Sequence, residues 1–260
     1  MNLIDTHCHL NMPPLSEDTD GVLARAADQG VLQVIVPAYD EVAWPEVAVL
    51  ANRPNVFSAF GLHPWVAHEV PPGGPLAEFE KRLAVQLTSG SVVAVGEIGL
   101  DTKIQECGLT EQLPIFEAQL TLAVDLGLPV ILHCRGAFEE LLTAVNKHNG
   151  KLRGVLHAYS RGPELAERFT AAGLHIAFGG AVTRDRAKRV RSAAASLPLD
   201  KIVLETDAPS IGLDGVLPED TEPGHVRVLA QTVADIRNES FETIAEVTTA
   251  NACRLFNLAT

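Results

Sequence analysis

The chain has 260 residues, of which 47% are hydrophobic, and its formal net charge is −13 at pH 7. This acidic balance argues against a general nucleic-acid-binding surface, which is normally basic, but it allows a polyanionic substrate whose charge is met locally by metal ions and a few arginines. The sequence has no stretch of about 20 apolar residues, so we expect no membrane span. None of the four cysteines lies in a CxxC pair, and we expect them to be reduced thiols in a cytoplasmic protein. We also expect no signal peptide.

Short apolar runs alternate with amphipathic segments along the whole chain. The runs are rich in Val, Ile, Leu and Phe and nearly free of polar residues until their last positions, which is typical of strands buried on both faces of a parallel sheet. We expect eight strands, at residues 3–10, 31–38, 55–64, 92–101, 129–135, 153–160, 174–180 and 201–209.

Helical patterns separate these strands. Apolar residues at steps of three or four, together with residues typical of helix ends, predict helices at residues 75–89, 109–127, 160–173 and 240–258. Eight strands with helices between them are the count of a (β/α)₈ TIM barrel, and no linker or repeat divides the chain, so we expect one barrel domain over residues 1–260. An open doubly wound sheet is the alternative, although it would scatter the polar strand ends along one edge.

Polar side chains close the predicted strands. In the first strand Asp5, His7 and His9 alternate with Thr6 and Cys8, so an extended chain would point the first three to one face, with the imidazoles about 7 Å apart. In a barrel, the carboxyl ends of all strands meet at one mouth, where such enzymes place their chemistry. The residues that end the strands in this way are His7, His9, His63, Glu97, His133, Arg135, His157, Glu205 and Asp207.

This set of side chains suits divalent metal ions. Imidazole nitrogens and carboxylate oxygens are ligands for Zn, Mn, Mg or Fe, and polar groups buried at strand ends need such a partner. Glu97 could be shared by two ions, because a carboxylate has two oxygens. Two ions about 3.5–4 Å apart would activate a water and hold the attacking and leaving oxygens. The two expected ligand sets are His7, His9, Glu97 and Asp207 for one ion, and Glu97, His133 and His157 for the other.

With these residues in place, the sequence resembles the TatD-like DNase family of metal-dependent hydrolases. The resemblance covers nearly the whole chain, and its motifs follow in family order, as IDTHCHL (4–10), GLHP (61–64), GEIGLD (96–101), LPVILHCR (128–135), GVLHAYS (154–160) and LETDAP (204–209). It implies a (β/α)₈ barrel with one or two divalent ions, typically Mg or Mn, that hydrolyses phosphodiester bonds of DNA. It also implies metal-ligand roles for His7, His9, Glu97, His133, His157 and Asp207.

Four of the strand-end residues are candidates for work on the substrate. We expect Asp207 to take the proton of the attacking water, Glu97 to bridge the ions, and His63 to donate to a phosphate oxygen or to the leaving group. We expect Arg135, together with His63, to bind a phosphate. The alternatives are that the backbone merely holds His63 and that Arg135 forms a structural pair with Glu139.

The remaining polar residues have expected roles outside the metal shell. Asp5 is expected to orient a ligand histidine or to cap its strand, and Glu205 to hold the architecture of the site through hydrogen bonds. The other histidines occupy no strand end, so we expect them on the surface or in ordinary packing; they are His68, His148, His175 and His225.

Two loops depart from the family pattern. The family has an aromatic and basic stretch after Gly-Leu-Asp, where this chain has TKIQ at residues 102–105. After the last strand the family tends to have Arg-Asn-x-Pro, where this chain has Asp220, Thr221 and Glu222 before a proline. A carboxylate close to a phosphate repels it, so this acidic loop, residues 214–222, favours another substrate.

One basic cluster follows the seventh predicted strand. It is either a solvated helix face or, if Arg184 or Arg186 opens toward the mouth, a means of steering a strand or a phosphate into the site. Its members are Arg184, Arg186, Lys188, Arg189 and Arg191.

These patterns favour a divalent-metal-dependent deoxyribonuclease, a monomer, which hydrolyses DNA in single strands or from its ends through attack of metal-bound hydroxide on phosphorus. The rival hypothesis is an amide, ester or lactone hydrolase on the same barrel, which the acidic loop favours. A non-catalytic nucleic-acid binder is the third hypothesis, and the complete set of ligands speaks against it.

Overall fold

The computed structural model describes residues 2–70, 74–88 and 90–259. Eight strands form one sheet in which hydrogen-bonded neighbours run parallel, and the order of the strands in the sheet is their order in the sequence. The strands are β1 Leu3–Asp5, β2 Val31–Pro37, β3 Val56–Phe60, β4 Val92–Asp101, β5 Val130–Arg135, β6 Gly154–Leu156, β7 Leu174–Phe178 and β8 Ile202–Leu204.

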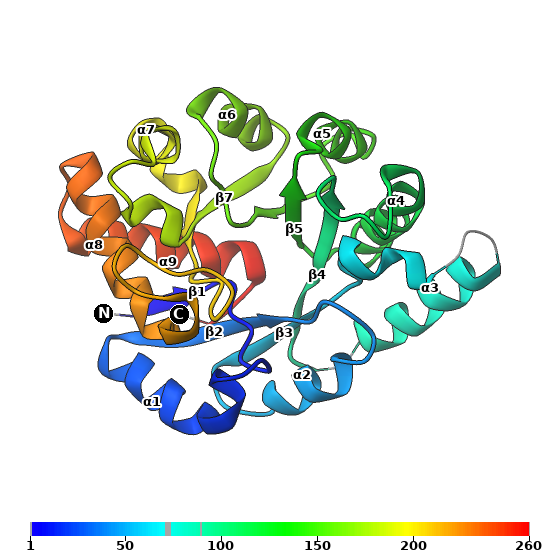
Figure 1. Cartoon of the computed structure of the whole chain (residues 1–260), viewed down its shortest axis with the longest axis horizontal. Helices are drawn as coiled ribbons and strands as arrows, with labels where there is room; N and C mark the ends of the chain where they lie inside the picture. Colours follow the sequence, from blue (N-terminus) through cyan, green and yellow to red (C-terminus); the bar gives the residue numbers. More distant parts are fainter. Residues whose placement is uncertain (1, 71–73, 89, 260) are drawn as a thin grey trace.

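Helices surround the sheet, as Figure 1 shows. Each lies after a strand in the chain, which is the alternation that places helices outside a parallel barrel. They are α1 Thr19–Asp28, α2 Trp44–Leu50, α3 Gly74–Gln86, α4 Leu109–Leu126, α5 Phe138–Asn146, α6 Pro163–Ala171, α7 Lys188–Ser196, α8 Val226–Arg237 and α9 Phe241–Phe256. The eight-stranded TIM barrel expected from the sequence is therefore confirmed.

The barrel closes between the first and last strands by contacts that lie just beyond the strand ends. The amide of Thr6 donates to the carbonyl of Leu204 (3.1 Å), that of Asp207 donates to His7 (2.9 Å) and that of His9 donates to Ala208 (2.8 Å). We call residues 6–9 and 204–208 the closing seam. It joins two segments about 200 positions apart in the sequence, and three of the expected ligands, His7, His9 and Asp207, lie on it.

The barrel interior contains at least one small or branched apolar residue from each strand. These residues form a cluster separate from the layer between strands and helices, and side chains of α9 belong to it. Such a dry floor keeps the polar groups at the opposite end of the strands from reaching water through the barrel. The eight residues are Ile4, Ile35, Ala59, Ala94, Ile131, Val155, Ala177 and Val203.

Several strands end earlier than the sequence predicts. β4 spans the predicted residues 92–101, whereas β1 ends at Asp5, β6 at Leu156 and β8 at Leu204. After β6 and β8 the extended backbone cannot continue far, because Ala158 and Asp207, two and three residues beyond the strand ends, adopt positive φ angles of 48° and 54°, which lie outside the region that strands occupy. The polar groups expected inside these strands therefore lie on the first residues after them.

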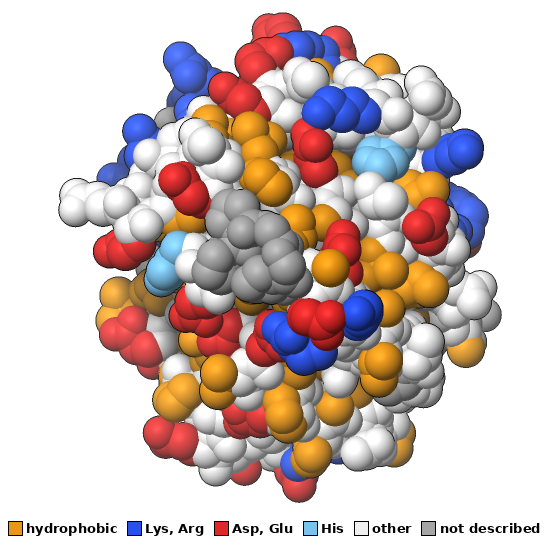
Figure 2. Space-filling view, turned by 90° about the vertical axis from the view of Figure 1, so that its right-hand side faces the viewer, with side chains coloured by type: hydrophobic (Ala, Val, Ile, Leu, Met, Phe, Trp, Pro, Cys, Tyr) orange, Lys and Arg blue, Asp and Glu red, His pale blue; other side chains and the backbone are white. Residues whose placement is uncertain are grey.

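In the described part of the chain, none of the helices combines the length and the hydropathy that a membrane crossing requires. On the face that Figure 2 shows, acidic and basic side chains lie interspersed with hydrophobic and uncharged ones.

Candidate metal centre

A pocket of about 580 Å³ opens at the carboxyl ends of the strands. Its polar lining consists mainly of imidazoles and carboxylates, and Tyr39, Trp65 and Arg135 stand around them. Because these residues lie at the carboxyl ends of β4 and β5 or in the loops that follow β1, β2, β3, β6 and β8, the barrel gathers side chains that are far apart in the sequence. The imidazole and carboxylate residues that line it are His9, His63, Glu97, His133, His157 and Asp207.

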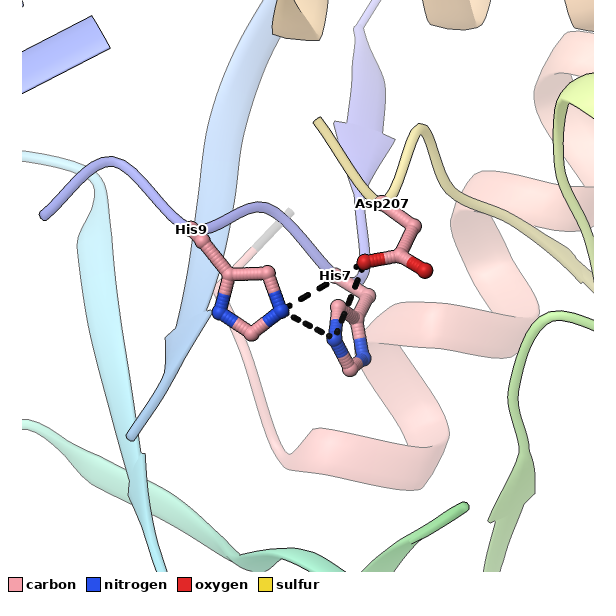
Figure 3. A group of neighbouring side chains, drawn as sticks. All are labelled: His7, His9 and Asp207. Carbon is pink, nitrogen blue, oxygen red and sulfur yellow. Dashed lines mark hydrogen bonds and ion pairs between the residues drawn. The ribbon is translucent and has the colours of Figure 1, made fainter. Parts of the chain in front are cut away.

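Four donor atoms converge at the closing seam. Nε2 of His7 lies 3.2 Å from Nε2 of His9, and Oδ1 of Asp207 lies 3.7 and 3.4 Å from these two nitrogens (Figure 3). Oε2 of Glu97 approaches the same nitrogens at 3.3 and 3.7 Å. The chain is not extended beyond Asp5, which lets the two imidazole tips meet far more closely than an extended strand would allow.

The other oxygen of Glu97 faces a second group of imidazoles. Oε1 lies 2.8 Å from Nε2 of His157, 3.2 Å from Nδ1 of His133 and 3.2 Å from Nε2 of His63. The nitrogens of His133 and His157 are themselves 3.4 Å apart. Glu97 therefore stands between two groups of donors and presents one oxygen to each.

The donor atoms fit divalent cations. Metal–ligand bonds of about 2.0–2.1 Å place neighbouring ligands about 3.0–3.4 Å apart in octahedral or tetrahedral geometry, and the distances above fall close to that range. Four buried polar atoms of the residues around this site find no hydrogen-bond partner among the described residues, which is costly unless another group satisfies the cluster. These atoms are Nδ1 of His7, His9 and His157, and Oε2 of Glu205.

Electrostatics within the cluster favours ionised carboxylates. Burial opposes a charge on Glu97, but the imidazoles of His157, His63 and His7 outweigh burial and hold its pKa well below the usual range. Burial likewise opposes a charge on His157, yet Glu97 raises the pKa of this imidazole to about 10. Burial and the neighbouring His157 lower the pKa of His7 to about 4. The ionised carboxylates thus stabilise a positive charge at the position that a cation would occupy.

Asp101, for which the sequence predicts no separate role, orients one of the imidazoles. Its Oδ2 lies 3.2 Å from Nε2 of His133, and it accepts hydrogen bonds from the indole N–H of Trp65 (2.9 Å) and the amide of Lys103 (2.7 Å). A carboxylate on the far nitrogen fixes the tautomer of a ligand histidine, so that Nδ1 of His133 is left for a metal ion. Glu97, Gly99 and Asp101 alternate along β4, and this period of two is the signal that could have indicated the role.

Gly99 allows this close approach of β4 to β5. It has a φ of 155°, and a Cβ at this position would lie 1.9 Å from the carbonyl oxygen of His133. The backbone of Gly99 therefore lies directly against His133. Glu97 contacts one ring nitrogen of that histidine and Asp101 contacts the other.

Asp5 does not reach a ligand ring. Its carboxylate accepts from the amide (2.9 Å) and hydroxyl (2.6 Å) of Thr206 and from the amide of His7 (3.2 Å), so it ties the two sides of the closing seam together. Glu205 acts in the same manner, because its Oε1 accepts a hydrogen bond from the amide of Ala158. It fixes the turn that follows His157.

His63 and Arg135 both line the pocket. Nδ1 of His63 accepts from the amide of Trp65 (3.2 Å), so the proton lies on Nε2, which donates to Glu97. The pair expected between Arg135 and Glu139 is not formed, since both oxygens of Glu139 accept hydrogen bonds from Arg168. The exposed guanidinium of Arg135 is left at the pocket rim.

The remaining histidines lie outside the cluster. Among the described residues, the groups with metal-ligand geometry contain none of them. Nδ1 of His225 accepts from the amide of Glu222 (2.9 Å), and the carboxylate of that residue pairs with Arg25 (2.7 Å). The others are His68, His148 and His175.

Comparison with known proteins places these residues among relatives. A family model described as TatD related DNase matches residues 4–257. The chain is 36% identical to the uncharacterized metal-dependent hydrolase YjjV of Escherichia coli K12, over 98% of each chain, and 30% identical to the human deoxyribonuclease TATDN3, over 98% of this chain and 95% of the relative. The crystal structure of YjjV superposes with a TM-score of 0.91 over 99% of this chain and 98% of that one.

Proposed function

Because this chain belongs to the TatD related DNase family of metal-dependent hydrolases, we propose that it hydrolyses phosphodiester bonds of DNA, in single strands or at strand ends. The observation that carries the proposal is the position of Glu97, whose two oxygens face two separate groups of donors. That arrangement suits two cations held side by side, which is a common device for phosphodiester hydrolysis.

The proposed ligands follow from the distances. His7, His9 and Asp207 with Oε2 of Glu97 would hold one ion, and His133 and His157 with Oε1 of Glu97 would hold the other. When bound, such ions lower the pKa of a water and neutralise charge on phosphoryl oxygens. The donor set suits Mg, Mn and Zn alike.

The other pocket residues would bind and orient the phosphate. Asp207 meets the two imidazoles through Oδ1, and its other oxygen faces away from them (Figure 3), where it could take the proton from the attacking water. Arg135 presents its planar guanidinium at the rim, a geometry that matches two phosphate oxygens. His63 carries its proton on Nε2, which donates to Oε1 of Glu97. If an ion took up that oxygen, the same proton could be donated to phosphate or to the leaving oxygen.

The rival, hydrolysis of an amide, ester or lactone, loses the feature that favoured it. None of the described residues 214–222 lines the pocket, and Glu222 is paired with Arg25 instead. The acidic loop therefore does not face the place where a phosphate would bind.

The test is a side-by-side assay of metal-stripped protein reloaded with Mg, Mn or Zn. We expect nucleotide release from single-stranded DNA with at least one of these ions, abolition by EDTA, and no comparable turnover of an acyl-ester panel. Turnover of esters without DNA cleavage would establish the rival function, and tight DNA binding without turnover in saturating Mg or Mn would establish the non-catalytic one.

A pair of variants tests the second ligand group. His133→Ala removes a donor that contacts Glu97, so the DNase activity should fall by about 100-fold or more. His148→Ala, outside the cluster, should keep wild-type activity and serves as the matched control. Full activity of His133→Ala would refute the second metal position.

A further inference from the structure

A second cleft begins where the pocket ends. Ser160 lines the pocket, and the next residue, Arg161, lines a separate cleft of about 600 Å³. The cleft lies between the N-terminal ends of α6 and α7 (Figure 1). Because each of these helices follows a strand, their first residues lie at the same end of the barrel as the proposed metal site.

Three cations line this cleft. Arg161, Lys188 and Arg189 are exposed, and within the described residues none of them has an ion pair or a hydrogen bond from its side-chain nitrogens. Arg161 instead lies over the ring of Phe138, at 5.0 Å from its centroid. One carboxylate, that of Glu164, also lines the cleft, so positive charge predominates.

Two other members of the basic cluster have structural partners. Arg184 donates to the carbonyl of Gly212 (2.8 Å), and Arg191 donates to that of Val182 (2.9 Å) and approaches Asp185 (3.4 Å). The cluster therefore contains two arginines that fix loops and two cations that face solvent at the cleft, while Arg186 is exposed and does not line the cleft.

The unpaired side chains of Arg161, Lys188 and Arg189 indicate an anionic ligand, because cations are the minority charge in this chain. It carries 33 acidic residues against 20 lysines and arginines, and several arginines elsewhere lie against acids, as in the pairs Arg82–Glu41 and Arg168–Glu139. Like charges gathered without partners repel one another unless an anion joins them. The adjoining pocket would hold one phosphate of the substrate, so further phosphates of the same strand are the nearest source of negative charge.

We propose that the cleft between α6 and α7 binds the sugar–phosphate backbone of a nucleic-acid strand whose reacting phosphate lies in the pocket. The proposal rests on the function proposed above. It makes the substrate a strand rather than a mononucleotide or dinucleotide, since only a longer chain reaches from the pocket past Ser160 to Lys188 and Arg189. A small, locally placed set of cations also explains how so acidic a protein would hold a polyanion.

The experiment compares two double variants of equal charge change. Lys188→Gln with Arg189→Gln removes two cations of the cleft and keeps Arg161 on Phe138. Lys151→Gln with Lys201→Gln removes two cations that precede β6 and β8, at the opposite end of the barrel. All four side chains are at least partly exposed, and circular dichroism confirms that both variants keep the fold.

The readout is binding of fluorescent single-stranded DNA of 12 and of 2 nucleotides, measured by anisotropy in EDTA over a range of salt concentrations. For the 12-mer, the cleft variant should bind about 10-fold more weakly than wild type, and its slope of log K against log salt should be smaller by about 1.4, or about 0.7 for each phosphate that the protein no longer neutralises. The control variant should bind like wild type, and the dinucleotide should not distinguish the proteins.

Each other outcome has one meaning. An equal loss of affinity in both variants, or no loss in the cleft variant, refutes the cleft while DNA hydrolysis in the metal assay still supports the proposed function. Failure of the wild-type protein to bind the 12-mer also refutes the cleft. Cleft-dependent binding without hydrolysis under any metal overturns the proposed function and leaves the cleft as a strand-binding surface.

Discussion

The side chain of Asp101 supports the site indirectly, because it contacts a ligand residue rather than a metal ion. It holds His133 by the nitrogen that does not face Glu97, and Trp65 holds Asp101 in turn. The carboxylate thereby sets both the orientation of the ring and the nitrogen that carries the proton.

Asp101→Asn should therefore weaken binding of the ion that His133 and His157 would hold by about 10–100-fold. The amide keeps the size of the side chain but removes the negative charge beside the imidazole. Calorimetric titration of the metal-stripped protein with Mn measures the affinity and the number of ions. Asp125→Asn, an exposed change on α4, is the control, and unchanged Mn affinity in Asp101→Asn would show that the contact with His133 has no such role.

At the scale of elements, β4 contributes most to the site, since Glu97, Gly99 and Asp101 all lie on it. Position 99 requires a glycine, because its positive φ is unfavourable for other residues and the carbonyl of His133 leaves no room for a Cβ. The strand can approach β5 closely only with a residue that has no side chain there.

Gly99→Ala should accordingly destabilise the protein by at least about 2 kcal/mol, because backbone atoms of β5 must move to admit the methyl group. Urea unfolding followed by circular dichroism gives the free energy of unfolding. Gly90→Ala is the matched control, since a Cβ there meets no atom within 4 Å. Equal free energies of unfolding for the two variants would contradict the steric argument.

The elements also show where sequence reasoning succeeds. The span of β4 was predicted to the residue, because its apolar run and its hydrogen-bonded neighbours end together. α4 was predicted to within one residue, because Gly127 adopts the left-handed conformation that ends a helix. The strands before His157 and Asp207 were predicted too long, since composition does not reveal the positive φ angles of Ala158 and Asp207. The strand before His7 was predicted too long as well.

The candidate site was predictable for a different reason. In a parallel barrel all strand ends meet, so knowing the strands suffices to bring His7, Glu97 and His133 together. Contacts across the mouth depend on register and rotamers instead. The bond between Asp101 and His133 and the support from Trp65 therefore emerge only from the structure.

At the scale of the whole molecule, the proposed ligands come from the segment after β1, from the middle of the chain and from the loop after β8. Ions bound there would cross-link parts of the barrel that otherwise meet through a few hydrogen bonds at the closing seam. A ligand that binds only the folded state stabilises that state in proportion to the logarithm of its concentration.

Metal loading should for this reason raise the melting temperature. At a free ion concentration 100 times the dissociation constant the gain is about 2.7 kcal/mol, or about 5 °C or more for a chain of this size. Differential scanning fluorimetry with Mn and with EDTA measures it. The increase should shrink in His7→Ala and persist in His148→Ala, and an equal increase in both would place the stabilising ion elsewhere.

The closing seam has one consequence for the synthesis of the protein. During synthesis, the imidazoles of the opening segment leave the ribosome first, whereas the aspartate that faces them follows about two hundred residues later. A nascent polypeptide therefore holds only a partial ligand set until its final quarter has emerged.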